Sequence, residues 1–290
     1  MNIIVALEQS ALLLYLSIGL LGFLVGSFIN VVAYRLPIML QKSWRQESLE
    51  FLEQVDTKPD TSTFNLSTPR SRCPACSHSI SALENIPVVS YLILGGRCKK
   101  CRTHISIRYP LVELTTALLS ILVAIQFGVS LHTVFALFFT WALISLSLID
   151  ADTQLLPDSI TLPLLWFALF ASLFNVFVDP SMALTGAIAG YLSLWSVFWL
   201  FKLITGKEGM GYGDFKLLAA IGALLGWEML PLVIILSAFA GATIGLTLIL
   251  LKGKSKNTAL PFGPYLSIAG FIALLWGDTI NQAYLQFAGI

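Results

Sequence analysis

Long apolar stretches separated by short polar segments occupy most of the chain. A helix needs about 20 apolar residues to cross the hydrocarbon core of a bilayer, and most of these stretches are long enough. The sixth is short and is weakened by Gly222 and Gly226, so a reentrant segment is the alternative there. The eight stretches lie at residues 10–33, 111–128, 132–149, 159–178, 182–204, 214–227, 229–251 and 262–287. The pattern predicts an all-α polytopic membrane protein with about eight transmembrane helices.

The composition indicates that a bilayer is the main solvent of this protein. Hydrophobic residues make up 57% of the 290 residues and charged residues only 11%, whereas an ordinary soluble domain carries about 25% charged residues. The mean hydropathy is +0.83, and the net charge is +1. These values exclude a water-soluble globule, a disordered chain and a nucleic-acid binder that relies on overall basic charge.

The positions of the basic residues predict the orientation of the chain. If all eight stretches cross, eleven Lys and Arg lie in residues 34–110, three from Lys202 to Lys216 and three from Lys252 to Lys256. All 17 then fall on one side of the membrane. Because cytoplasmic loops are enriched in Lys and Arg, we expect a cytoplasmic large loop and two periplasmic termini.

The long polar section predicts three domains. They are a first transmembrane helix at 1–33, a cytoplasmic loop at 34–109 and a seven-helix membrane domain at 110–290. One part of the loop has apolar residues spaced for an amphipathic helix, either on the membrane surface or packed on the rest of the loop. These residues are Trp44, Phe51, Leu52 and Val55.

All four cysteines lie in the loop as two pairs, Cys73 with Cys76 and Cys98 with Cys101. Two Cys-x-x-Cys pairs at this separation are typical of a tetrahedral zinc site with four thiolates. Two disulfides are the alternative, but a cytoplasmic location keeps thiols reduced. The closed set of four ligands predicts a structural zinc ion, because a catalytic zinc keeps one position open.

Gly95 and Gly96 lie just before the second cysteine pair. Glycines at this place permit a tight turn of the backbone. A close approach of the backbone to a small ligand is the alternative interpretation.

Two acidic residues lie at the predicted cytoplasmic ends of membrane helices. Asp150 ends the third stretch, and Asp214 begins the sixth within Gly211-Tyr212-Gly213-Asp214, whose glycines would admit an extended substrate. Carboxylates at membrane depth are costly and indicate function by default. At about 4 Å and an effective dielectric near 20, two such charges repel by about 4 kcal/mol, enough to keep one protonated. The pair would supply an acid and a base side by side, as in aspartic proteases.

Each acid also has a simpler structural explanation. Asp150 ends a helix that can face headgroups and water, and Asp214 can cap the N-terminus of its helix, where a carboxylate is favoured. Asp152 and Asp158 compete with Asp150 for the role of partner to Asp214. Spacing alone does not choose among these three.

The chain resembles the bacterial type IV prepilin leader peptidases over nearly its whole length. The matching segments occur in the same order as in the family, among eight apolar stretches, and this combination is highly specific for the family. These segments are Gly26-Ser27-Phe28-Ile29-Asn30-Val31-Val32, Tyr34-Arg35-Leu36-Pro37, the two cysteine pairs, Tyr109-Pro110-Leu111-Val112-Glu113, Ile149-Asp150, Leu156-Pro157-Asp158 and Gly211-Tyr212-Gly213-Asp214-Phe215-Lys216-Leu217.

The resemblance implies an aspartic protease of the bacterial inner membrane, with Asp150 and Asp214 as its catalytic carboxylates. It implies that type IV prepilins and type II secretion pseudopilins are the substrates, from which a basic leader is removed at the cytoplasmic face. The four-cysteine loop implies the form that also methylates the new amino terminus with S-adenosylmethionine as donor. In this family the region of Gly95 and Gly96 is tied to methyl transfer.

Two functions from other classes remain as alternatives. A proton-coupled membrane transporter would use intramembrane carboxylates as a relay, although such groups should lie near mid-membrane rather than at helix ends. A non-catalytic assembly scaffold with a zinc-stabilised loop would tolerate the loss of either Asp150 or Asp214.

Overall fold

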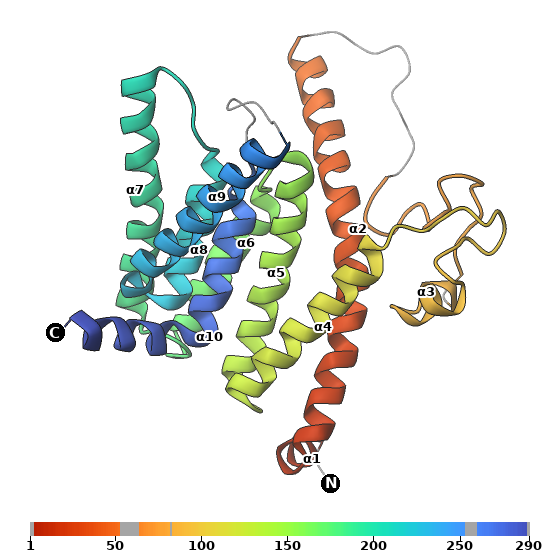
Figure 1. Ribbon diagram of the computed structural model, residues 1–290, viewed down its shortest axis with the longest axis horizontal. Helices are drawn as coiled ribbons and strands as arrows, with labels where there is room; N and C mark the ends of the chain where they lie inside the picture. Colours follow the sequence, from red (N-terminus) through yellow and green to blue (C-terminus); the bar gives the residue numbers. More distant parts are fainter. Residues whose placement is uncertain (1–2, 53–63, 82, 253–259, 289–290) are drawn as a thin grey trace. The chain divides into compact units, whose positions relative to one another are not determined.

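The computed structural model describes residues 3–52, 64–81, 83–252 and 260–288, and its regular secondary structure is helical (Figure 1). The described chain divides into two compact units, residues 1–125 and 126–290. The helices of the first unit are α1 (Ile3–Gln9), α2 (Ala11–Phe51), the short helices η1 (Leu83–Asn85) and α3 (Val89–Ile93), and α4 (Arg108–Phe127), which reaches the boundary. Those of the second are α5 (Leu131–Thr153), α6 (Asp158–Ser172), α7 (Pro180–Thr205), α8 (Tyr212–Leu225), η2 (Trp227–Met229), α9 (Leu230–Lys252) and α10 (Gly263–Ala288).

A helix forms at each of the eight predicted apolar stretches, which confirms the all-α fold class. Within the described residues, five helices are long and apolar enough to cross a membrane, namely α2, α4, α5, α7 and the segment Trp227–Leu250, which covers η2 and most of α9. Helices α6 and α8 are shorter, with 15 and 14 residues. The number of crossings therefore stays a prediction.

Helix α2 continues past residue 33, where its apolar stretch ends, to Phe51. The polar residues that follow are mostly Gln, Lys, Arg and Glu, which are strong helix formers. Side-chain hydrogen bonds one turn apart support this extension, from Ser43 to Glu47 at 2.8 Å and from Gln46 to Glu50 at 3.0 Å. The loop therefore begins with an extension of the first membrane helix rather than with a separate amphipathic helix.

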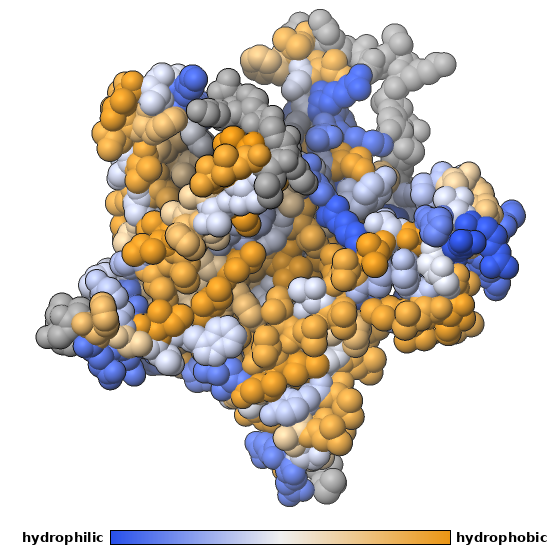
Figure 2. All heavy atoms as spheres, viewed as in Figure 1, coloured by the Kyte–Doolittle hydropathy of each residue, from blue (hydrophilic) through white to orange (hydrophobic). Residues whose placement is uncertain are grey.

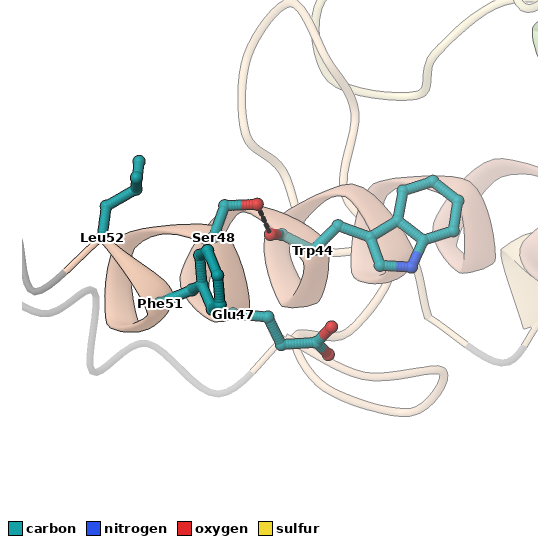
Figure 3. A pocket seen from close by; sticks show the side chains of 5 residues that line it. All are labelled: Trp44, Glu47, Ser48, Phe51 and Leu52. Atoms are coloured by element: carbon teal, nitrogen blue, oxygen red, sulfur yellow. Dashed lines mark hydrogen bonds between the residues drawn. The ribbon is translucent and has the colours of Figure 1, made fainter.

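The apolar residues at the end of α2 remain exposed in the described chain. Trp44, Phe51 and Leu52 line an open hollow of ≈ 510 Å³ together with Glu47 and Ser48 (Figure 3). A single helix forms this hollow, and it holds one carboxylate. The fourth apolar residue of the predicted stripe, Val55, lies outside the described residues.

Close backbone contact joins α2 to α4 within the first unit. A Cβ atom on Gly22 or Gly26 of α2 would lie only 2.7 Å from the Cα atom of Ala117 or Glu113 of α4. Small residues spaced four apart allow membrane helices to approach in this way. Asn30 continues the antiparallel register, because its side-chain amide donates to the carbonyl of Tyr109 at 3.2 Å.

Helix α8 is the most enclosed helix of the second unit and packs against α6 and α7 (Figure 1). Apart from Lys216, every residue from Asp214 to Leu225 is buried. Its 14 residues extend about 21 Å, less than the hydrocarbon core of about 30 Å. Neighbouring helices therefore surround a short central helix, and Gly226, at φ +84°, ends it.

Candidate active-site cavity

Three chain segments that are far apart in sequence line one cavity of ≈ 400 Å³ in the second unit. They are the end of α5 with the loop after it, the loop before α8 and the residues before α10. The lining residues are Asp150, Gln154, Leu155, Leu156, Glu208, Gly209, Met210, Gly211, Tyr212, Gly213, Asp214, Leu260, Pro261 and Phe262. Both acids that the sequence singles out therefore face the same cavity.

Asp150 lies in the last turn of α5 and is 5% exposed. Its Oδ2 accepts a hydrogen bond of 2.8 Å from the backbone N–H of Gly263, the first residue of α10. A Cβ atom on Gly263 would lie 2.8 Å from that oxygen, so a glycine lets the helix start approach the carboxyl. The α10 N-terminus places its positive dipole end at this acid.

Asp214 lies in the first turn of α8 and is 6% exposed. The N-cap residue is Gly211, whose backbone N–H donates to Oδ2 of Asp214 at 3.2 Å. Asp214 therefore stabilises the helix start from its third position rather than as the N-cap itself. Its other oxygen, Oδ1, is buried and has no hydrogen-bond partner among the described residues.

The structure separates Asp150 from its two competitors. Asp150 lines the same cavity as Asp214. Asp152 is exposed and does not line the cavity. Asp158 binds Lys216, with both carboxylate oxygens accepting from Nζ at 2.6 and 2.8 Å. Geometry thus pairs Asp214 with Asp150.

The two glycines before Asp214 have different surroundings. Gly211 is exposed, and a Cβ atom there would have no neighbour nearer than 3.9 Å, so the backbone is open to an approaching chain. Gly213 packs against Leu156, whose Cβ would lie 2.5 Å from a Cβ on the glycine. Gly213 therefore also allows the start of α8 to pack against the loop that follows α5.

Gly263, whose backbone N–H binds Asp150, was not singled out by the sequence analysis. The signal was the dipeptide Gly263-Pro264 at the start of the last apolar stretch, because proline is favoured in the first turn of a helix. Nothing local, however, connects this helix start with Asp150, which lies 113 residues earlier.

The four cysteine thiols form a second cluster, in the first unit. Their sulfur atoms all lie within 4.8 Å of one another and could hold a metal ion. The Sγ atoms of Cys73 and Cys101 are 3.7 Å apart, and those of Cys76 and Cys98 are 4.0 Å apart. None of the four forms a disulfide.

The same backbone turn forms each half of this cluster. The N–H groups of Cys73 and Cys98 donate at 2.9 Å to the carbonyls five residues later, at His78 and Thr103. Gly95 and Gly96 precede the second turn at φ +60° and +66°. These values place both residues in the left-handed region of backbone conformation, which glycine adopts most readily. A Cβ atom added at Gly95 would have no neighbour within 4 Å.

Comparison with known proteins identifies the family. A model of the bacterial peptidase A24 N-terminal domain matches residues 20–127, and a model of the type IV leader peptidase family matches residues 137–246. A protein from Pseudomonas aeruginosa is 57% identical to the chain over 93% of both sequences. The chain belongs to the type IV leader peptidase family.

Other members of the type IV leader peptidase family are similarly close. One from Aeromonas hydrophila is 55% identical over 94% of both chains, and one from Legionella pneumophila is 47% identical over 94% of this chain and 95% of its own. All three relatives are named prepilin leader peptidase/N-methyltransferase. No solved structure matches the chain.

Proposed function

We propose that this protein is a membrane prepilin leader peptidase that also methylates the amino terminus it exposes. Family membership and the names of the relatives support both activities. The observation that carries the proposal is the burial of Asp150 and Asp214 in one cavity. Neither the transporter nor the scaffold alternative has a comparable observation in its favour.

In the proposed cleavage, the two carboxyls share one proton. The ionised carboxylate removes a proton from a water molecule, whose oxygen attacks the carbonyl carbon of the scissile peptide. The protonated partner donates its proton to the carbonyl oxygen. The C–N bond then breaks, and the leaving nitrogen takes up the proton that the first carboxyl removed from water, which makes it the new amino terminus. The second carboxylate regains its proton from a hydroxyl of the tetrahedral intermediate as the new carboxyl group forms. The unpaired Oδ1 of Asp214 offers a position for the water or the peptide carbonyl.

The substrate assignment follows from the family. We propose type IV prepilins, and the pseudopilins of type II secretion, as the proteins whose basic leader is removed. A basic leader stays on the cytoplasmic side by the rule that favours Lys and Arg there. We further propose that the protein lies in the inner membrane, with the loop in the cytoplasm and both termini in the periplasm. This orientation would place the cavity at the inner surface of the bilayer.

The cysteine cluster fits a structural zinc ion. Zinc–sulfur bonds of about 2.3 Å in a tetrahedron place the sulfurs about 3.8 Å apart, close to the 3.7 and 4.0 Å found here. Cys73, Cys76, Cys98 and Cys101 would hold the ion. The bound ion would tie the two cysteine turns together and fix the segment between them.

The methyl donor of the proposed second activity is S-adenosylmethionine. When bound, it supplies the methyl group that the new amino terminus receives. Gly95 leaves open space beside its backbone, which suits the close approach of a small ligand. We propose that Gly95 and Gly96 shape the donor site, with the second cysteine turn holding them in place.

Replacing either aspartate tests the proposed cleavage. We expect Asp150→Asn and Asp214→Asn each to reduce leader removal by about 10²–10⁴-fold, because each removes one partner of a general acid–base pair. Leader removal is measured with purified protein in vesicles and a synthetic prepilin. Asp152→Asn is the matched control, since this exposed acid does not line the cavity, and should cleave normally. Retained cleavage in both variants would reject the mechanism and favour the scaffold.

A further inference from the structure

A row of apolar side chains on the cysteine loop has no partner in the described chain. Val89, Leu92 and Ile93 lie at positions i, i+3 and i+4 of α3, which places them on one face of the helix. Leu92 is 71% exposed and Ile93 is 78% exposed. The loop also exposes Leu83 and Ile107. We name the face of Val89, Leu92 and Ile93 the α3 face.

The opposite side of α3 packs within the loop. A Cβ atom on Gly96 would lie 2.9 Å from the ring of Tyr91, so this side contacts the backbone before the second cysteine pair. The α3 face therefore points outward. Figure 2 shows apolar surface over α3, beneath the hydrophilic surface of the cysteine loop.

A hydrogen bond sets the position of α3 along the membrane helices of its own unit. The backbone N–H of Val88 donates to Oε2 of Glu113 at 2.8 Å, and this carboxylate is buried in α4. Glu113 lies five residues after Arg108, where α4 begins, which is about 8 Å along the helix. Amphipathic segments insert to a depth of about 5–10 Å at a bilayer surface. With Arg108 at the membrane surface, as the predicted crossing of α4 requires, helix α3 starts at the depth of the lipid interface.

The beginning of the described loop lies farther out. Arg35 donates to the carbonyls of Asn65 and Pro69 at 2.9 and 2.6 Å, whereas Glu113 packs against Gly26. Gly26 and Arg35 are nine residues apart on α2, or about 14 Å along a helix. The loop therefore extends from a position above the membrane at Pro69 to the interface at α3.

The positive charge of the loop indicates which kind of partner covers the α3 face. Residues 64–107 contain six Lys or Arg and one acidic residue, Glu84. A second copy of this loop would bring like charges together, and so would the basic leader of the proposed substrate. Anionic lipid headgroups attract such clusters, and α4, whose Glu113 accepts the hydrogen bond from Val88, is long and apolar enough to cross a membrane.

We propose that the α3 face inserts into the surface of a bilayer with anionic headgroups, and that the basic residues around the cysteine pairs bind those headgroups. The partner of the α3 face is lipid rather than protein. The membrane thereby holds the cysteine loop at a fixed depth.

Photo-crosslinking of the full chain tests this proposal. Benzoylphenylalanine is introduced at Leu92 or, as the matched control, at Thr68, an exposed and uncharged residue beside Pro69. Each variant is purified, compared with the unmodified chain by gel filtration and reconstituted in vesicles of phosphatidylethanolamine and phosphatidylglycerol. After irradiation, mass spectrometry should find several-fold more lipid adduct at position 92 than at position 68. Vesicles of phosphatidylcholine alone should give less adduct at position 92.

Three results would overturn the proposal. The first is equal lipid adduct at positions 92 and 68, which would place α3 away from the bilayer. The second is a crosslink from position 92 mainly to another protein chain, which would make the face a protein interface. The third is an equal yield of adduct in the two lipid compositions, which would remove the role of anionic headgroups. None of these readouts depends on peptide cleavage.

Discussion

At the scale of single residues, the cavity depends on backbone groups as much as on its two acids. Asp150 and Asp214 each accept one amide hydrogen bond, from Gly263 and Gly211. Both donors are glycines at the start of a helix. Hydrogen bonds to charged groups contribute about 1.5–3 kcal/mol, so the two donors orient the carboxyls and favour negative charge in a buried place.

Gly263→Ala tests this role in positioning. The added Cβ would lie 2.8 Å from Oδ2 of Asp150, and loss of the hydrogen bond should lower kcat for leader removal by about ten- to a hundred-fold. KM should change little, because Gly263 acts through Asp150. Gly241→Ala is the control, since its nearest neighbour is a tyrosine ring at 3.3 Å. A rise in KM at unchanged kcat would contradict a positioning role.

At the scale of elements, α8 positions Asp214 because its neighbours enclose it. Gly186 and Gly190 of α7 face the carbonyl oxygens of Gly222 and Leu218. Closer to the start of α8, the ring of Phe215 lies 5.6 Å from that of Phe198, which is also on α7. These glycine contacts and the fully buried ring of Phe215 fix the rotation and the depth of α8. They therefore fix the position of Asp214.

A methyl group at the contact of α7 with α8 should loosen this packing. We expect Gly186→Ala to destabilise the protein by about 1–3 kcal/mol, because its Cβ would overlap the backbone carbonyl of Gly222, which cannot move alone. Thermal unfolding in detergent measures the change. Gly277→Ala should have a smaller effect, since its nearest neighbour is the flexible side chain of Met229. Equal Tm values for the two variants would refute this explanation of the packing.

At the scale of the whole molecule, the two clusters of chemistry belong to different units. Residues 1–125 contain the four cysteines, and residues 126–290 contain Asp150 and Asp214. Each cluster is assembled within its own unit. Damage to one cluster should therefore affect the two proposed activities to different extents.

Removing two metal ligands tests this separation. Cys73→Ser combined with Cys76→Ser should release about one zinc ion per chain, because a tetrahedral site needs four ligands. Methyl transfer should then fall more than leader removal. Metal content is measured by mass spectrometry, and both activities are measured on one prepilin. Ser79→Ala, an exposed change after the same turn, is the control. An unaltered metal content would contradict the site.

The sequence by itself determined where the helices and the thiol cluster form. Apolar stretches specify membrane helices through local composition, and the spacing of the pairs that begin at Cys73 and Cys98 specifies two short turns, so both features could be predicted. Hydropathy did not locate the end of α2, because the polar residues up to Phe51 continue a helix that no longer needs a bilayer.

Only the tertiary structure decided which groups meet. The sequence offers three possible partners for Asp214, namely Asp150, Asp152 and Asp158. Which of them lines the cavity depends on the packing of α5, α8 and α10. The amide of Gly263 reaches Asp150 across 113 residues, a contact that no local pattern encodes. Burial and long-range hydrogen bonds arise only when helices pack. For this reason the sequence could identify the candidate acids, but only the fold shows which of them share a cavity.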